Sequence, residues 1–228
     1  MEVDVQTAVV WYLVFLISIV LHEAGHALAA YLGGDDTAYA GGQVSLNPIP
    51  HIQREPLGTV LFPIFFIFAI GWPLGWASAP YNPYWEQQYP RRSAWMAAAG
   101  PGANFLLLAL AVVGIKLGLA TGVFEHNTSG YIYYLHAVLG TSQFWDNAAR
   151  FLSMLLFLNL VLGIFNLFPV PPMDGATVIT LLMPEDFATR FLTAIRGGAI
   201  GLVGMIFAWT LFPRVIQKIT VPFYQALF

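Results

Sequence analysis

The apolar run at residues 8–31 contains one cluster of histidine and carboxylate side chains, in His22-Glu23-Ala24-Gly25-His26. Two histidines spaced i and i+4 lie one turn apart on the same face of a helix, so both imidazoles can bind one metal ion. Zn²⁺ is the usual metal for such a pair, and the glutamate between them is placed to act as a general base. An ionisable side chain at the centre of a membrane span costs about 2.5–3.5 kcal/mol, which favours a functional interpretation. The alternative is a helix end that carries two hydrogen-bonded histidines.

The composition is that of an integral membrane protein. Of the 228 residues, 58% are hydrophobic and 9% are charged, and the mean hydropathy is +0.69. Soluble domains usually carry about 25% charged residues, so we expect the chain to lie in a lipid bilayer as one domain, residues 1–228. A net charge of −3 without a basic stripe argues against nucleic-acid binding. The chain has no cysteine, so His, Asp or Glu must hold any metal.

Several apolar segments predict an all-α polytopic membrane protein with a bundle of about five to six transmembrane or re-entrant helices. After residues 8–31 they are residues 57–79, 93–120, 148–168 and 197–212. Residues 213–228 are expected to form a surface helix or part of a sixth span. Pro63 and the Gly71–Gly75 interruption favour a re-entrant hairpin for the segment 57–79. The weak alternation at residues 43–46 predicts a small β-hairpin or edge strand within residues 37–46, directly after the first span.

A catalytic zinc site needs three protein ligands and an open position, so the two histidines require a partner. Asp174 is a candidate because it follows a span in a turn that contains Pro169, Pro171 and Pro172 and is closed by Gly175. Such prolines form a rigid extended segment that could hold a carboxylate near the membrane. The alternative is that Asp174 caps a helix beginning at Gly175. The residues alone leave both interpretations open.

Three motifs in chain order resemble the site-2 protease family of intramembrane zinc metalloproteases, in its compact prokaryotic-type branch without PDZ or CBS domains. They are HEAGH at residues 22–26, GPGAN at residues 100–104 and NLFPVPPMDG at residues 166–175. The resemblance implies that His22, His26 and Asp174 bind one Zn²⁺ ion and that Glu23 is the general base and acid. It also implies that Asn104 and Asn166 hold substrate or stabilise an oxyanion. The alternative for both asparagines is hydrogen bonding between helices.

The implied activity is hydrolysis of peptide bonds within or near transmembrane helices of other proteins. A substrate helix must unwind first, and an edge strand at residues 37–46 could hold it by β-addition. One alternative is a catalytically silent membrane scaffold or chaperone of the same fold, whose expected mark is the loss of Glu23 or of a ligand. Another is a metal transporter, which needs several intramembrane ionisable sites rather than one cluster. The sequence makes no prediction of the oligomeric state.

Crossing parity predicts the topology independently of any family. The histidine pair and Asp174 both follow the C-terminal part of a span, so an even number of crossings must separate them. Residues 93–120 and 148–168 provide two crossings, and residues 57–79 must therefore return to the side they left. Arg54 and the Arg91-Arg92 pair favour the cytoplasmic side for both flanks. We expect residues 121–147 outside, and the active site toward the cytoplasmic side of a prokaryotic plasma membrane.

Overall fold

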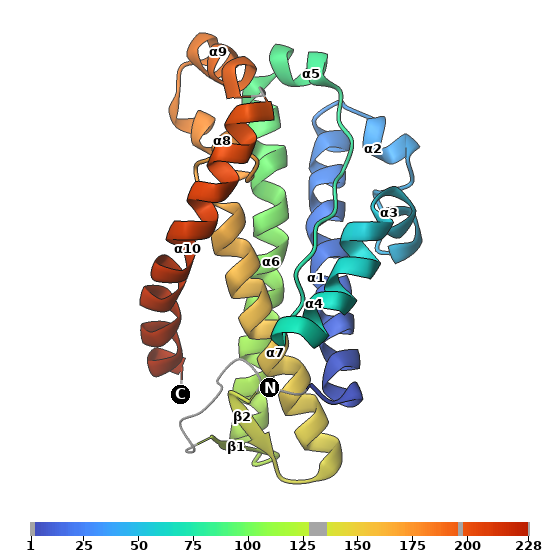
Figure 1. Cartoon of the computed structure of the whole chain (residues 1–228), viewed down its shortest axis with the longest axis vertical. Coiled ribbons are helices and arrows are strands. Elements are labelled where there is room, and N and C mark those ends of the chain that lie inside the picture. Colours follow the sequence, from blue (N-terminus) through green and yellow to red (C-terminus); the bar gives the residue numbers. More distant parts are fainter. Residues whose placement is uncertain (1–2, 128–135, 196–197, 228) are drawn as a thin grey trace.

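Long apolar helices dominate the structure, a computed structural model that describes residues 3–127, 136–195 and 198–227 (Figure 1). Four helices are long and apolar enough to cross a membrane. They are α1 (Val5–Leu32), α6 (Pro90–Ala120), α7 (Gln143–Asn166) and α10 (Gly198–Leu227). The shortest has 24 residues, and about 20 residues suffice for the hydrocarbon core. The predicted all-α polytopic fold is confirmed.

The sequence marks where two of these helices begin. The Asp4 carboxylate accepts hydrogen bonds from Thr7 N and Thr7 Oγ1, at 2.9 and 2.8 Å, and α1 starts at the next residue. Ser142 caps α7 in the same way through Trp145 N. Side chains that accept from the first free N–H groups stabilise a helix start, which explains why both helices begin where they do.

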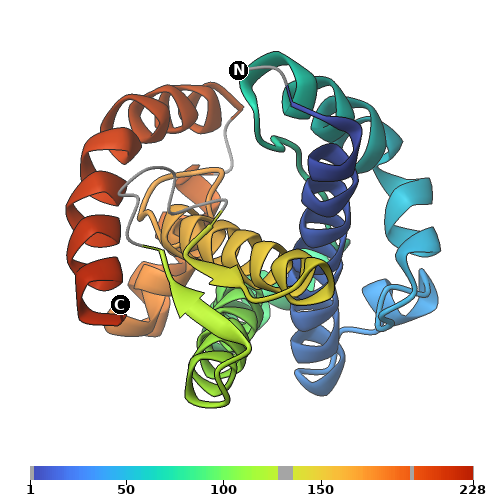
Figure 2. The same ribbon diagram turned by 90° about the horizontal axis from the view of Figure 1, so that it is seen from below.

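Helices α1, α6 and α7 pack against one another and enclose the core, which includes the fully buried side chains of Trp11, Ile115 and Met154. Seen from below, α10 stands at the periphery of the bundle (Figure 2). Lipid is as apolar as the helix surfaces, so close packing depends on small residues. At Gly25, an added Cβ would lie 2.8 Å from the Ala99 carbonyl oxygen. Helices α1 and α6 are therefore in close contact at the level of the histidine motif.

Residues 57–79 form a helix followed by an extended return, the arrangement expected of a re-entrant element (Figure 1). A π-helical turn, η1 (Leu57–Leu61), continues into α4 (Phe62–Ile70) and is bent by 114° against α3 (Pro48–Arg54). Beyond α4 the chain runs back in extended form to α5 (Pro83–Gln88), at the end of the bundle where α1 ends (Figure 1). Trp76 N donates to Gly58 O at 3.1 Å, which ties the returning segment to the π-helical turn.

The small sheet lies elsewhere than predicted, and the expectation of a hairpin after the first span is wrong. Thr37–Ala40 is a short helix, α2, and the strands are β1 (Phe124–His126) and β2 (Val138–Gly140), which pair antiparallel between α6 and α7. The alternation at residues 43–46 has a different cause. Gln43 is buried and donates to Ser78 O at 3.1 Å, so its side chain binds the returning segment instead of lining a strand.

The C-terminal third brings the proline-rich turn over the bundle end. After α7 the chain forms α8 (Gly175–Val178), a 3₁₀ turn η2 (Ile179–Leu182) and α9 (Glu185–Ile195). An ion pair of 3.2 Å between Arg91 and Glu185 joins α9 to α6. Residues 213–227 continue α10 rather than form a separate helix, although Pro213 and Pro222 lie within it. Gly197, the predicted start of that span, lies outside the described residues.

Candidate metal centre

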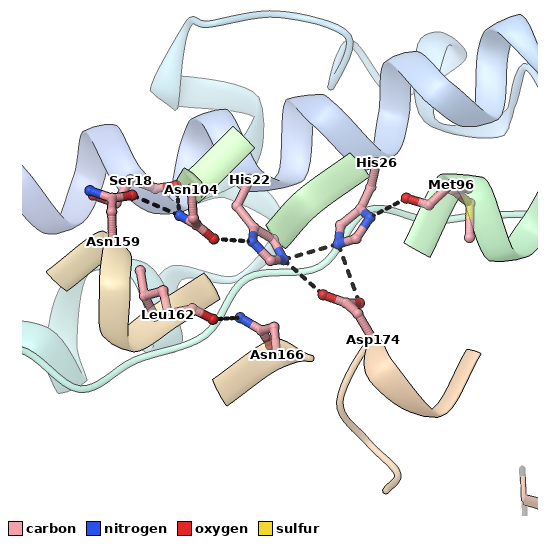
Figure 3. A network of polar contacts seen from close by, with 9 residues as sticks. All are labelled: Ser18, His22, His26, Met96, Asn104, Asn159, Leu162, Asn166 and Asp174. Atoms are coloured by element: carbon pink, nitrogen blue, oxygen red, sulfur yellow. Dashed lines mark hydrogen bonds and ion pairs between the residues drawn. The ribbon is translucent and has the colours of Figure 1, made fainter. Parts of the chain in front are cut away.

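Three side chains from two distant segments, the second half of α1 and the turn after α7, converge on one point (Figure 3). His22 and His26 project from one face of α1, with their Nε2 atoms 3.0 Å apart. Asp174, in the turn after α7, places Oδ2 at 3.1 Å from His22 Nε2 and Oδ1 at 3.3 Å from His26 Nε2. The convergence required by crossing parity is therefore present.

Asp174 does not behave as a helix cap. It precedes α8, but its side chain makes no capping hydrogen bond, and both carboxylate oxygens lie against the histidines. The geometry thus favours the ligand interpretation over the cap.

The second nitrogen of each ring determines its tautomer. His26 Nδ1 lies 2.8 Å from Met96 O, and a carbonyl oxygen only accepts, so this Nδ1 carries the hydrogen. His22 Nδ1 lies 2.6 Å from the amide oxygen Oδ1 of Asn104 and carries a hydrogen for the same reason. A neutral imidazole then has its lone pair on Nε2. Both lone pairs consequently point toward the Asp174 carboxylate and toward each other.

This donor set fits a metal ion. Two lone pairs and a carboxylate repel one another inside a buried site unless a cation lies between them. In a tetrahedral zinc site with bonds of about 2.0–2.2 Å, neighbouring ligand atoms are about 3.3–3.6 Å apart. The three separations here, 3.0, 3.1 and 3.3 Å, are close to that spacing. His22 and His26 are 4% and 8% exposed, so the site is also shielded from bulk water.

Glu23 lies beside the ligands. It occupies the same turn of α1 and is 5% exposed. Its carboxylate and the ligand nitrogens of His22 and His26 lie within 4.8 Å of one another. Glu23 is therefore close enough to serve a reacting group held at the histidines, as the sequence predicts.

Gly100 allows α6 to cover the site. A Cβ added there would lie 2.3 Å from His26 Nε2 and 2.6 Å from His22 Nε2, within the space of the ligands. The sequence alone predicts no role for Gly100 beyond its place in the motif at residues 100–104. Its signal was its place in the glycine-containing segment before Asn104, since small residues in apolar helices mark close helix contacts.

The two predicted asparagines have different surroundings. Asn104 is fully buried, and its amide nitrogen Nδ2 lies 2.9 Å from Asn159 Oδ1 and 3.4 Å from Ser18 O. Its oxygen accepts from His22 Nδ1, the ring nitrogen that faces away from Asp174. Both ends of the Asn104 amide are therefore occupied by hydrogen bonds within the protein. Asn166 is half-buried and donates through Nδ2 to Leu162 O of its own helix at 3.0 Å. The substrate or oxyanion roles expected for the two residues stay predictions. Asn159 belongs to no motif used above.

Comparison with known proteins agrees with the geometry. Residues 10–211 match the family described as Peptidase family M50. YwhC of Bacillus subtilis is 33% identical over 186 residues, which cover 81% of this chain and 74% of YwhC. Rip2 of Mycolicibacterium smegmatis is 32% identical over 163 residues (71% of this chain), and Rip2 of Mycobacterium tuberculosis is 31% identical over 174 residues (75%). The names of these relatives provisionally describe them as zinc metalloproteases.

The matched region spans 52% and 56% of the two Rip2 proteins, about half their length. No solved structure matches this chain. The family match includes all four residues of the candidate centre and three of the four long apolar helices almost completely. The chain therefore belongs to peptidase family M50, the site-2 protease family of zinc metalloproteases.

Proposed function

We propose that this protein is an intramembrane zinc metalloprotease that hydrolyses peptide bonds within or near transmembrane segments of other membrane proteins. The observation that carries the proposal is the convergence of His22, His26 and Asp174 on one point, with Glu23 beside them, among helices long enough to span a bilayer. A soluble protease has no need to place this cluster in an apolar helix. Intramembrane ionisable groups are costly and by default functional.

The residues divide the chemistry among them. A zinc ion held by His22, His26 and Asp174 would supply Lewis acidity toward the scissile carbonyl group. Glu23 takes a proton from the attacking water and returns it to the leaving amine, since its carboxylate lies within 4.8 Å of the ligand nitrogens of His22 and His26. Asn104 fixes the His22 ring, which supports a positioning role in place of a contact with the oxyanion.

A cavity supports access of water and release of product. It has a volume of about 270 Å³ and is lined by Met173, next to the proposed ligand, and by Pro171, Ala176 and Leu192. The Asp174 side chain is 21% exposed, whereas His22 and Glu23 are buried. The exposed edge of Asp174 and the cavity beside Met173 lie on the same proline-rich turn, which is the side from which we expect water to enter.

Residues 37–46 are not a strand, so the extended segment at residues 71–82 takes their place as the segment expected to pair with an unwound substrate. Among the described residues, its backbone–backbone hydrogen bonds are those of Gly71 N to Ile67 O, of Trp76 N to Gly58 O and of Glu86 N to Asn82 O. The segment is extended and runs along α1 (Figure 1). Backbone groups at membrane depth need partners, and an unwound substrate segment could supply them by β-addition.

We further propose that the active site faces the cytoplasm, in the plasma membrane of a prokaryote. Arg91 and Arg92 lie at the active-site end, in the first turn of α6, and positive charge favours the cytoplasmic side. Because the chain lacks cysteine, single introduced cysteines report the topology. We expect Thr121→Cys to react with a membrane-impermeant maleimide in intact cells, and Tyr84→Cys, 81% exposed on α5, only after permeabilisation. The reverse pattern would refute this orientation.

The decisive test of catalysis is Glu23→Gln in purified protein with a single-span model substrate. We expect cleavage to stop while zinc remains bound, because the amide is nearly isosteric but cannot accept a proton. Glu125→Gln, a change in β1 far from the site, is the matched control and should cleave normally. Continued cleavage by Glu23→Gln would refute the assignment. An unsubstituted protein that holds zinc but cleaves no substrate would instead support the silent scaffold.

A further inference from the structure

A chain of buried polar side chains extends behind His22 into the apolar core (Figure 3). Asn104 in α6, Asn159 in α7 and Ser18 in α1 are all 0% exposed, and together they join the three core helices. Ser18 precedes His22 by one helical turn. Buried amides in an apolar bundle are tolerated only when their hydrogen bonds are satisfied, so this arrangement constrains each member.

Backbone carbonyls determine the direction of every hydrogen bond in the chain. Asn159 Nδ2 lies 2.9 Å from Leu155 O, which can only accept, so the NH₂ end of this amide is identified. The same NH₂ group donates to Ser18 Oγ at 2.9 Å, while Ser18 Oγ donates to Val14 O at 2.7 Å. Asn159 Oδ1 must therefore face Asn104.

The orientation passes on to the ligand. Because Asn159 Oδ1 accepts, the NH₂ end of Asn104 faces it at 2.9 Å, and Asn104 Oδ1 is left to face His22 Nδ1 at 2.6 Å. An amide oxygen stabilises the His22 tautomer with hydrogen on Nδ1 and the lone pair on Nε2. That tautomer is the one able to bind a metal beside Asp174.

We propose that Asn159, supported by Ser18, is a positioning residue for the metal centre: it holds the Asn104 amide in the orientation that keeps the His22 Nε2 lone pair free for the metal. The proposal rests on the zinc site of the proposed function. Without the Asn159 oxygen, Asn104 has no group that distinguishes its two ends except the more distant Ser18 O at 3.4 Å. A flipped Asn104 would present NH₂ to His22 Nδ1 and favour hydrogen on Nε2.

The alternative interpretation is that Ser18, Asn104 and Asn159 only hold the three helices together by hydrogen bonds. Both interpretations predict lower stability when Asn159 is removed, so stability alone cannot separate them. They differ in metal affinity and in the His22 tautomer. Loss of a residue that orients a ligand typically lowers metal affinity by about 10–100-fold.

The test compares three variants of α7 in detergent. We expect Asn159→Leu to bind zinc about 10–100-fold more weakly in competition with a chelator. Asn159→Asp should bind nearly as the unsubstituted protein does, because a protonated carboxyl keeps both an acceptor for Asn104 and a donor for Leu155 O. Ser153→Ala is the matched control, since Ser153 is equally buried in α7 and hydrogen-bonds Ala149 O outside the network.

The tautomer provides the second readout. In metal-free protein labelled with ¹⁵N-histidine and assigned with a His22→Ala variant, His22 should carry its hydrogen on Nδ1, and this preference should be lost in Asn159→Leu. If Asn159→Leu does not fold, Asn159→Ala, which removes the same amide oxygen, is measured, and its zinc affinity should also fall. Unchanged zinc affinity in whichever variant folds would overturn the proposal, as would an equal loss in Ser153→Ala.

These outcomes are separable from failure of the proposed function. Zinc affinity and the His22 tautomer are read without any substrate. A protein that binds zinc in this manner but cleaves nothing would refute the protease and leave the role of Asn159 standing. If Glu23→Gln stops cleaving and Asn159→Leu binds zinc with unchanged affinity, the protease assignment stands and the role of Asn159 is refuted.

Discussion

Substituting Gly100 by alanine is the most incisive small change the structure offers. Gly100 lies on the face of α6 that covers the ligands, and its missing side chain leaves the space in which the two imidazoles sit. The added Cβ would be 2.3 Å from His26 Nε2, 2.4 Å from His26 Cε1 and 2.6 Å from His22 Nε2. A single methyl group therefore meets both histidine ligands at once.

The magnitude follows from these distances. To leave Gly100→Ala in ordinary contact, His26 Nε2 would have to withdraw about 1 Å, from 2.3 Å to 3.4 Å or more. Metal–ligand distances tolerate only about 0.2 Å, so the site cannot follow this movement and still bind. Overpacking costs about 1–3 kcal/mol, and alanine in place of glycine within a helix returns about 1 kcal/mol. We expect a net destabilisation of up to about 2 kcal/mol and a near-complete loss of zinc.

The assay is metal analysis of purified protein together with thermal unfolding in detergent. Gly102→Ala is the matched control, because it lies in the same helix two residues on and its added Cβ would meet no atom within 4 Å. The control should retain zinc and be as stable as the unsubstituted protein or slightly more so. If Gly100→Ala retained one zinc ion per chain, the placement of α6 over the ligands would be wrong.

Other perturbations test the surrounding structure. Gly75→Ala should lower the melting temperature, with an overpacking cost of about 1–3 kcal/mol, because its Cβ would lie 2.1 Å from Gly58 O where the re-entrant element closes. Asp35→Ala removes the acceptor of Asn82 N at 2.7 Å, so hydrogen exchange should quicken in residues 72–82 while zinc content is unchanged. Ser142→Ala should cost about 1 kcal/mol by removing the α7 cap, measured by chemical unfolding. Removing zinc with a chelator should lower the melting temperature of the unsubstituted protein, and an unchanged value would contradict a metal bound to the folded state.

Local patterns sufficed where the cause was local. The apolar segments predicted the spans because a bilayer demands about 20 apolar residues whatever the neighbours are. The i and i+4 spacing of His22 and His26 placed both rings on one face because helix geometry alone determines it. Crossing parity even required residues 57–79 to return, since a chain cannot bring Asp174 to the histidines otherwise. By contrast, alternation at residues 43–46 was misleading, because Gln43 is buried through a contact with Ser78, which lies 35 residues away.

The motif at residues 22–26 determined that a metal pair could form, and composition determined that it would lie in a membrane. Only the tertiary structure showed that the Asp174 carboxylate faces the two histidines and makes no capping hydrogen bond, because its direction depends on how the turn after α7 packs against α1. It also decided the tautomer of His22, through hydrogen bonds from Asn104 and Asn159 that no spacing in the sequence connects. Periodicity describes one helix at a time, whereas a metal site is a contact between several.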